Sequence, residues 1–386
     1  MNIKLLEAYK KTFESKPLKY FSSPCRVNII GEHTDYNKGL ALPAAISKYI
    51  QAVVGIRDDR KISLKSLEKS KVVTVDLDNI SNDPENNWGN YPLGIFATLQ
   101  KRGYELPFGL DIIYYSNVPI ASGLSSSASL LDLTAFIASV MYNIPLDKKE
   151  IALLAHQSET EFNGLRCGVM DEFAISLGKK DKCILLNCKD NSYTYEDISF
   201  QDLSLVVIVS NVKRSLIASP YNKRVEECTE ALNLIKKEFD VDSLSDIKVS
   251  DLPMCRKLIK DDVLYKRVRH IVTENQRVRD FVKASKSGDI RTMIHLLNKS
   301  HESLRDDYEV TGEYLDYIHE ISLKYGAFAE RMTGAGFGGS SIALIKKRDF
   351  KHFKENLTRD YIEKYHIKPT IFLAEICDGL TVEDIK

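Results

Sequence analysis

The sequence lacks any long apolar run. Its most apolar stretches, such as residues 203–209, are far shorter than the about 20 residues that a helix needs to cross a bilayer. Residues 1–13 mix Lys with Leu and have none of the apolar core that a signal peptide carries. We therefore expect no membrane partner and no export signal.

The chain also lacks net charge, because 54 Lys and Arg residues balance 54 Asp and Glu residues. This balance argues against a nucleic acid or an acidic membrane recognised through bulk charge. The seven cysteines are an odd number and include no C-x-x-C pair, so we expect free thiols in a reducing cytoplasm. The sequence leaves the oligomeric state open, and a monomer is compatible with it.

The most informative segment that is present is P-I-A-S-G-L-S-S-S-A-S-L, residues 119–130. A glycine turn and three consecutive serines open onto the apolar run 130–141, which predicts a helix. Small residues let an anion approach the backbone, and a helix start offers free N–H groups and the positive end of its dipole. No Lys follows as in a Walker A loop. We predict a phosphate-binding loop of another kind, because three serines exceed what a helix cap requires.

A second informative segment is residues 23–37, where Arg26, Glu32, His33 and Asp35 occur close together without a helical or strand pattern. Carboxylates and an imidazole can exchange hydrogen bonds with the hydroxyls of a neutral sugar. A metal site is a second possibility, although the neighbouring Arg disfavours it. An ordinary solvated charged surface is the third, and composition alone does not choose among them.

Two further segments contain glycine turns. Asp171 follows the turn at Gly168 and begins a predicted helix, where its ordinary role would be to interact with the helix dipole. Residues 334–339 match G-x-G-x-x-G by letter, but they precede a predicted strand, whereas the dinucleotide fingerprint follows a strand and opens a helix. We therefore reject a Rossmann site there and keep a second anion-binding loop or a plain turn as alternatives.

Strand-like and helical patterns alternate in the first half of the chain, which indicates helices layered against a sheet. We expect strands at 50–56, 71–77, 110–115 and 183–187, and helices at 93–102, 130–142 and 148–161. The composition becomes polar near residues 189–200, where we place a domain boundary. The second half begins with a strand at 203–210, continues with helices to about residue 328, and has a further strand at 341–345.

These segments together resemble the sugar kinases of the GHMP superfamily, and most closely the galactokinase family. Residues 26–37, R-V-N-I-I-G-E-H-T-D-Y-N, resemble that family's signature, residues 123–130 its ATP loop and residues 333–339 its third motif. Further similar segments are 167–171, 211–215, 221–224 and 303–312. The resemblance covers residues 24–345 in family order.

The resemblance implies a two-lobed fold of α/β and α+β type. A mixed-sheet N-terminal domain would comprise residues 1–195 and an α+β C-terminal domain residues 196–386, with the active site between them. It implies transfer of the γ-phosphate of ATP to the anomeric hydroxyl of galactose with Mg²⁺ as the metal. Phosphoryl transfer of this kind depends mainly on positioning and charge stabilisation.

The resemblance also implies roles for individual residues. Asp171 would be the catalytic carboxylate, which orients the hydroxyl and accepts its proton late, and Arg26 would stabilise charge on the transferring group. The sugar would contact Glu32, His33, Thr34, Asp35, Gly168 and Tyr221. ATP would contact Ser66, Trp88, Ala121, Ser122, Gly123, Leu124, Ser125, Ser126 and Ser127. Mg²⁺ would be held by Ser127 and Glu159, as suits an ion that takes oxygen ligands.

The sequence departs from the family's usual residues at Cys25, Leu131 and Glu172. A kinase for a related sugar, such as N-acetylgalactosamine, galacturonate or arabinose, is therefore an alternative, and a non-enzymatic galactose sensor is a second one.

Glu172 adjoins Asp171, but adjacent side chains at a helix start diverge by about 100°. We expect Glu172 to point away from the reacting hydroxyl and to make a structural contact, for example with Arg166.

Overall fold

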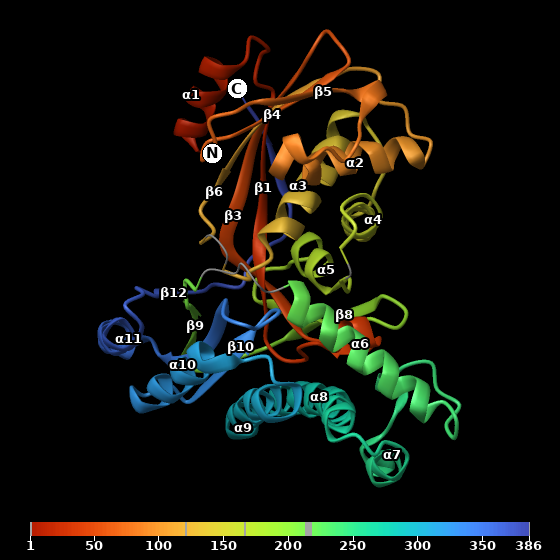
Figure 1. The fold of residues 1–386 in the computed structure, drawn as a ribbon. Coiled ribbons are helices and arrows are strands. Elements are labelled where there is room, and N and C mark those ends of the chain that lie inside the picture. Colours follow the sequence, from red (N-terminus) through yellow and green to blue (C-terminus); the bar gives the residue numbers. More distant parts are fainter. Residues whose placement is uncertain (1, 120–121, 166, 213–217, 386) are drawn as a thin grey trace.

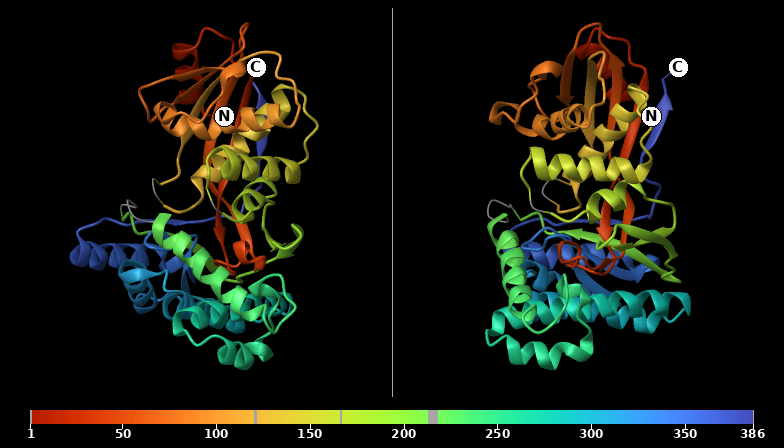
Figure 2. Two further views of the ribbon diagram at one scale, coloured as in Figure 1. Left: turned by 45° about the vertical axis from the view of Figure 1, so that its right-hand side comes forward. Right: turned by 90° about the vertical axis from the view of Figure 1, so that its right-hand side faces the viewer.

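The computed structural model describes residues 2–119, 122–165, 167–212 and 218–385. The chain forms an upper and a lower lobe that stay distinct when the molecule is turned (Figures 1 and 2). A six-stranded sheet lies in the upper lobe, a four-stranded sheet in the lower lobe, and a three-stranded sheet accompanies them. The fold is thus the two-lobed arrangement of mixed sheet and helices that the sequence predicts.

The six-stranded sheet has the order β13-β1-β3-β6-β4-β5, in which only β4 and β6 pair in parallel. Its strands are β1 (Lys19–Asn28), β3 (Pro43–Ile56), β4 (Lys61–Ser66), β5 (Val73–Asp76), β6 (Leu110–Ser116) and β13 (Thr381–Asp384). Side chains alternate across it as strand geometry requires. Tyr20 and Val53 pack on one face with the helix α1 (Ile3–Thr12), whereas Phe21 and Val54 join the core beneath the helices of the other face.

That other face carries the helices that position the site. They are α2 (Asn90–Lys101), α3 (Ser126–Met141), α4 (Lys148–Gln157) and α5 (Met170–Ser176), and α4 continues into the π-helical turn η4 (Ser158–Phe162). A capping box in which Asp147 and Glu150 bond to each other's backbone N–H begins α4. Short 3₁₀ turns occur at η1 (Asp35–Asn37), η2 (Leu77–Asn79) and η3 (Pro84–Gly89). The small sheet pairs β2 (Leu40–Ala41), β7 (Lys182–Asn187) and β8 (Ser192–Asp197).

The lower lobe is built on the antiparallel sheet β10-β11-β9-β12. Its strands are β9 (Leu203–Val209), β10 (Ala329–Thr333), β11 (Ser340–Lys346) and β12 (Thr370–Leu373). Its helices are α6 (Ala218–Ile235), α7 (Leu252–Leu258), α8 (Asp262–Lys286), α9 (Ile290–Ser303), α10 (Gly312–Lys324) and α11 (Phe350–Tyr365). Single turns complete it at η5 (Leu244–Asp246), η6 (Val249–Asp251), η7 (Leu304–Tyr308) and η8 (Lys347–Asp349).

One hydrophobic core runs through both lobes. Along β9, Leu205, Val207 and Val209 belong to the same buried cluster as the upper sheet, whereas Val206 and Ile208 belong to the cluster of the lower helices. This alternation is the period of two expected of a strand between two packed layers. The lobes are therefore joined by continuous apolar packing, which places the groups at their junction in fixed positions.

The strands expected from the sequence agree with β3, β5, β6, β7, β9 and β11 to within a few residues, except that β3 begins earlier at Pro43. The helix after the serine loop begins at Ser126 rather than at residue 130, so the last two serines form its first turn. The expected boundary at 195/196 falls inside β8, and β13 returns to pair with β1. We therefore keep two domains as a proposal and assign the terminal strand to the first.

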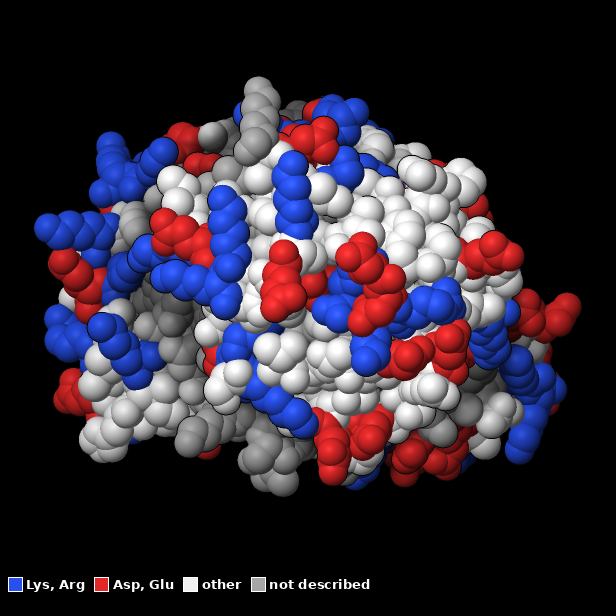
Figure 3. Space-filling model, turned by 90° about the horizontal axis from the view of Figure 1, so that it is seen from above, with Lys and Arg blue, Asp and Glu red and all other residues white. Residues whose placement is uncertain are grey.

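Lys and Arg side chains are interspersed with Asp and Glu over the face seen from above (Figure 3). None of the helices in the described ranges is long and apolar enough to cross a membrane. All seven cysteines are unpaired, as expected from their odd number.

Candidate active site

The centre of the site is an ion pair between Arg26 and Asp171. Arg26 lies near the end of β1 and its side chain is buried, whereas Asp171 lies in the first turn of α5 and keeps 30% of its side chain exposed. Nε of Arg26 donates to Oδ1 of Asp171 at 2.7 Å and Nη2 donates to Oδ2 at 2.9 Å. This two-point geometry fixes the plane of the carboxylate and holds its free side toward solvent.

The serine loop meets this pair directly. Nη1 of Arg26 donates to the carbonyl of Gly123 at 2.9 Å, and the hydroxyl of Ser125 donates to Oδ2 of Asp171. Gly123 has a φ of 73° and Ser125 a φ of 57°, so the loop turns sharply into α3. Ser126 and Ser127 are then the first residues of α3, where the backbone N–H groups are free to bind phosphate. The sequence does not predict the contact between Ser125 and Asp171, because it joins two separate motifs.

The glycine loop of the second domain packs against the serine loop. A Cβ built on Gly334 would lie 2.8 Å from the carbonyl oxygen of Gly123, and Gly334 has a φ of 85°. The hydroxyl of Ser340 donates to the carbonyl of Ser122 at 2.5 Å. The loop at 334–339 thus supports the predicted phosphate loop, and its glycine is required at that close approach.

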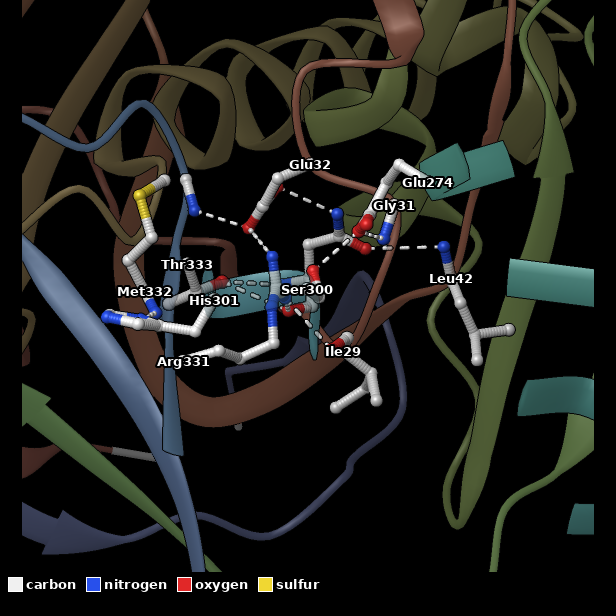
Figure 4. A network of polar contacts seen from close by, with 12 residues as sticks. Ile29, Gly31, Glu32, Leu42, Glu274, Ser300, His301, Arg331, Met332 and Thr333 are labelled. Carbon is white, nitrogen blue, oxygen red and sulfur yellow. Dashed lines mark hydrogen bonds and ion pairs between the residues drawn. The ribbon is translucent and has the colours of Figure 1, made fainter. Parts of the chain in front are cut away.

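Glu32 is held by residues of both domains (Figure 4). Its Oε1 accepts from the backbone N–H of Gly334 at 2.6 Å and lies 3.5 Å from Nη2 of Arg331, while Oε2 accepts from Asn28 at 2.8 Å. Arg331 is completely buried and donates through Nη1 to the carbonyls of Asn28 and Ile29 at 2.9 Å. Burial raises the pKa of Glu32 above its ordinary value. Its contact with a sugar stays a prediction.

Glu274 fixes the same loop from α8. It accepts from the backbone N–H of Gly31 at 2.9 Å and from the hydroxyl of Ser300 at 2.6 Å. Figure 4 shows Glu274 close to Gly31, the neighbour of Glu32 in the loop after β1. Nε of Arg277 lies 2.6 Å from Oε2 of Glu274. Burial by itself would raise the pKa of Glu274, but the positive charges of Arg277, His270 and Arg331 have the larger, opposite effect and lower it to about 2.

His33 lies among aromatic side chains. Its Nδ1 is 2.9 Å from the hydroxyl of Tyr36, which is 2.7 Å from the hydroxyl of Tyr308. The His33 ring lies 4.9 Å from the ring of Tyr308 and 5.8 Å from that of Tyr221 on α6, measured between centroids. Burial lowers the pKa of His33 to about 3, so its imidazole is neutral. The structure thus brings His33 and Tyr221 together. Tyr36 and Tyr308 lie in segments that resemble the family, but the sequence alone gives neither of them a contact with His33.

Asp35 lies against Gly168. A Cβ added to Gly168 would be 2.2 Å from Oδ2 of Asp35, so only glycine allows this approach. Burial, followed by the nearby charge of Asp171, raises the pKa of Asp35 to about 7. Thr34 is turned the other way: its hydroxyl donates to the carbonyls of Gly31 and Leu40 at 2.9 and 2.8 Å. The structure therefore gives Thr34 a loop-stabilising role, and its contact with the sugar stays a prediction.

Two residues predicted to lie near the nucleoside are neighbours. Ser66 ends β4 opposite Tyr114 of β6, and the indole of Trp88 lies edge-on to the Tyr114 ring at 5.9 Å. The hydroxyl of Ser66 donates to Glu68 at 3.0 Å.

Leu124 of the predicted phosphate loop is completely buried, so only its backbone could face phosphate. The predicted contact at Ala121 lies outside the described residues.

A group of oxygen donors lies beside Asp171. Ser127 on α3 and Glu159 on η4 belong to elements that pack together. Glu159 and Glu172 are both buried, and burial followed by a neighbouring carboxylate raises the pKa of each to about 8. Glu172 contacts His156 at 3.4 Å, and Arg166, its expected partner, lies outside the described residues.

Comparison with known proteins identifies the family. Residues 7–56 match the galactokinase galactose-binding signature, residues 90–179 the GHMP kinase N-terminal domain and residues 281–363 the GHMP kinase C-terminal region. The chain is 37% identical to the galactokinase of Clostridium acetobutylicum over 97% of both chains. It is 38% identical to that of Fusobacterium nucleatum over 97% of this chain and 98% of the relative. The chain belongs to the galactokinase family.

Solved structures agree with this assignment. The fold superposes on Lactococcus lactis galactokinase complexed with galactose with a TM-score of 0.95, at 36% identity over 98% of this chain and 99% of the other. A mevalonate kinase shares the fold with a TM-score of 0.67 at 21% identity, over 93% and 99% of the two chains. The predicted family and the two-lobed fold are thus confirmed, and the protein is a kinase.

Proposed function

We propose that the protein transfers the γ-phosphoryl group of ATP to the anomeric hydroxyl of D-galactose. The observation that carries this proposal is the joint placement of Arg26, Asp171 and Ser125 at the start of a helix with free N–H groups. The galactokinase relatives support galactose as the sugar. A phosphate at the start of α3 and a hydroxyl at Asp171 would lie next to each other, as phosphoryl transfer requires.

We propose the following roles. Asp171 orients the sugar hydroxyl, since both its oxygens are already held by Arg26 and its exposed side remains free to accept. It takes the hydroxyl proton late, when the oxygen has begun to bond to phosphorus. Arg26 stabilises the negative charge that spreads over the transferring group, and it is preorganised because its own position is fixed at three points. Gly168 and Asp35, with His33 and Tyr221, form the wall that contacts the sugar.

The donor set beside Asp171 fits Mg²⁺ bound with ATP. Ser127 would supply a hydroxyl and Glu159 a buried carboxylate, which are the oxygen ligands that Mg²⁺ prefers. When bound, Mg²⁺ would neutralise charge on the phosphates. Ser127→Ala should raise the Mg²⁺ concentration needed for half-maximal activity, and Glu159→Gln should raise it more, because a charged ligand is lost. A Mg²⁺ titration that matches the parent for both variants would remove these residues from the metal site.

The proposed reaction is tested by measuring ATP consumption against a panel of sugars. Galactose, N-acetylgalactosamine, galacturonate and arabinose are offered with Mg²⁺, and the product is identified by phosphorus NMR. We expect ADP and galactose 1-phosphate from galactose. Turnover of another panel member without turnover of galactose would refute the sugar assignment and leave the kinase assignment in place.

We also propose that the protein acts in a reducing compartment such as the cytoplasm. Support comes from its seven unpaired cysteines, three of which have only intermediate burial. Labelling of free thiols in freshly lysed, acid-quenched cells should therefore modify the three cysteines of intermediate burial. Disulfide-linked species in that sample would contradict the proposal.

A further inference from the structure

Four metal-binding side chains come together next to the proposed Mg²⁺ donors. They are His156 at the end of α4, Glu159 on η4, Cys167 in the loop before α5, and Glu172 on α5. Nδ1 of His156 lies 3.4 Å from Oε1 of Glu172 and 3.9 Å from Sγ of Cys167. Sγ of Cys167 lies 3.2 Å from Oε2 of Glu159.

These separations are close to the edges of a tetrahedral zinc site. With Zn–S near 2.3 Å and Zn–N or Zn–O near 2.0–2.1 Å, tetrahedral donor atoms lie about 3.3–3.6 Å apart. The 3.4 Å separation lies within that range, and the 3.2 and 3.9 Å separations lie just outside it, by an amount that small side-chain rotations would correct. The donor atoms of His156, Cys167 and Glu172 all lie within 4.8 Å of one another, as ligands of one ion do, and Glu159 adjoins them through Cys167.

Glu172 provides an independent sign of a ligand. Its side chain is completely buried, and neither carboxylate oxygen has a hydrogen-bond partner among the described residues. Within that part of the chain, His156 is the only basic side chain at ion-pair distance. Besides His156, the carboxyl of Glu159 faces Glu172, and two buried carboxyls side by side without a cation are costly. A bound cation would satisfy both.

The donor types select the metal. A thiol and an imidazole are poor ligands for Mg²⁺, which takes oxygen donors in octahedral geometry. One sulfur, one nitrogen and two carboxylates in a tetrahedral arrangement suit zinc. We propose that His156, Cys167 and Glu172 form a binding site for Zn²⁺, with Glu159 as a fourth ligand that reaches the ion by side-chain rotation and is shared with the proposed Mg²⁺ site.

The site is accessible from one side. The His156 side chain is 25% exposed and Cys167 has intermediate burial, whereas Glu172 forms the closed end. An ion can therefore enter past the imidazole and the thiol. Binding converts the Cys167 thiol to a thiolate and releases its proton to solvent.

Occupancy would inhibit the kinase, and this part of the inference rests on the proposed function. Glu159 would serve both metals, so zinc and Mg²⁺ compete for it. Cys167 also precedes Gly168, where an added Cβ would lie 2.2 Å from Oδ2 of Asp35, so the backbone at this point is close to the proposed sugar site. A fixed Cys167 would hold that contact in one position. Inhibition by zinc should therefore be relieved by added Mg²⁺ and not by added galactose.

Binding is tested on the full chain after removal of metals with a chelator. Titration with Co²⁺ should give visible bands of a tetrahedral ion and a thiolate charge-transfer band, both removed by one equivalent of Zn²⁺. Cys167→Ser should abolish the charge-transfer band, and Glu172→Gln should weaken zinc at least tenfold in competition with a chromophoric chelator. Circular dichroism and thermal unfolding check that both variants fold. If one of them does not fold, the other still tests the site.

Two matched controls make the result specific. Cys377→Ser removes another thiol of intermediate burial. His319→Asn removes a ligand from a second cluster, His301, His319 and Glu330. Both should bind zinc like the parent protein. Parent-like binding by Cys167→Ser and Glu172→Gln, or loss of binding in a control, would overturn the site.

The kinetic consequence is tested separately with free zinc set by a metal buffer. Mg²⁺ should restore activity in the parent, and Cys167→Ser should be less sensitive to zinc. Zinc binding without competition from Mg²⁺ would overturn the shared role of Glu159. Absence of sugar kinase activity would refute the proposed function alone, because zinc binding is measured without ATP or sugar.

Discussion

Replacing Arg26 with Lys isolates the contribution of guanidinium geometry at the site. Arg26 makes three hydrogen bonds of 2.7–2.9 Å, two to Asp171 and one to the carbonyl of Gly123. Lys keeps the positive charge, but its single ammonium cannot reach all three acceptors from that position. Hydrogen bonds to charged groups contribute about 1.5–3 kcal/mol each, so losing two would cost about 3–6 kcal/mol.

If that loss is expressed in the transition state, kcat falls by about 10²–10⁴. The assay is coupled detection of ADP at saturating ATP and sugar, with sugar binding measured separately by calorimetry. Arg57→Lys is the matched control, since Arg57 also makes three charged hydrogen bonds, to Asp59 and Asp111, outside the site. A folded Arg26→Lys protein with kcat within threefold of the parent would refute the role of this geometry.

Three other outcomes follow from the site. Asp171→Asn should retain sugar binding but lose at least about two orders of magnitude in kcat, and near-normal turnover would contradict its role. Gly168→Ala should raise the sugar KM at least about tenfold, because the new Cβ would lie 2.2 Å from Oδ2 of Asp35; an unchanged KM would place the sugar elsewhere. Burial raises the pKa of Glu172 to about 8, against about 4.3 when unfolded, so its stabilising effect is complete below about pH 4 and is lost as the pH rises to about 8. In chelator, the unfolding free energy should fall by up to about 1.4 kcal/mol per pH unit across that window, and less steeply in Glu172→Gln; parallel curves would contradict the shift.

Local patterns were sufficient to predict most elements of the fold. The apolar runs at 203–210 and 341–345 correspond to β9 and β11, because a buried strand needs little more than a short apolar segment. The start of α3 was placed too late, since Ser126 and Ser127 carry no apolar signal. The pairing of β13 with β1 joins the two ends of the chain. No local pattern specifies such a partner.

The candidate site was predictable where one segment carries several reactive side chains, as at Arg26 and Glu32. It was not predictable where the contact joins distant segments. Tyr308 reaches His33 through Tyr36 across the lobes, and His156 meets Glu172 through the turn of η4. Tyr and His are also common in ordinary hydrophobic cores, so their presence in the sequence does not by itself indicate a function.

The packing between the lobes limits how substrates can enter. The core that contains Phe21 and Val54 continues through Leu205 and Val207, so a wide hinge motion would expose apolar surface at about 25 cal/mol per Å². Arg331 would also lose its buried bonds to Asn28 and Ile29. Both costs oppose separation of the lobes. Access to Asp171 does not require such a separation, because 30% of its side chain is already exposed, and the groups that perform chemistry keep their relative positions across a fixed junction.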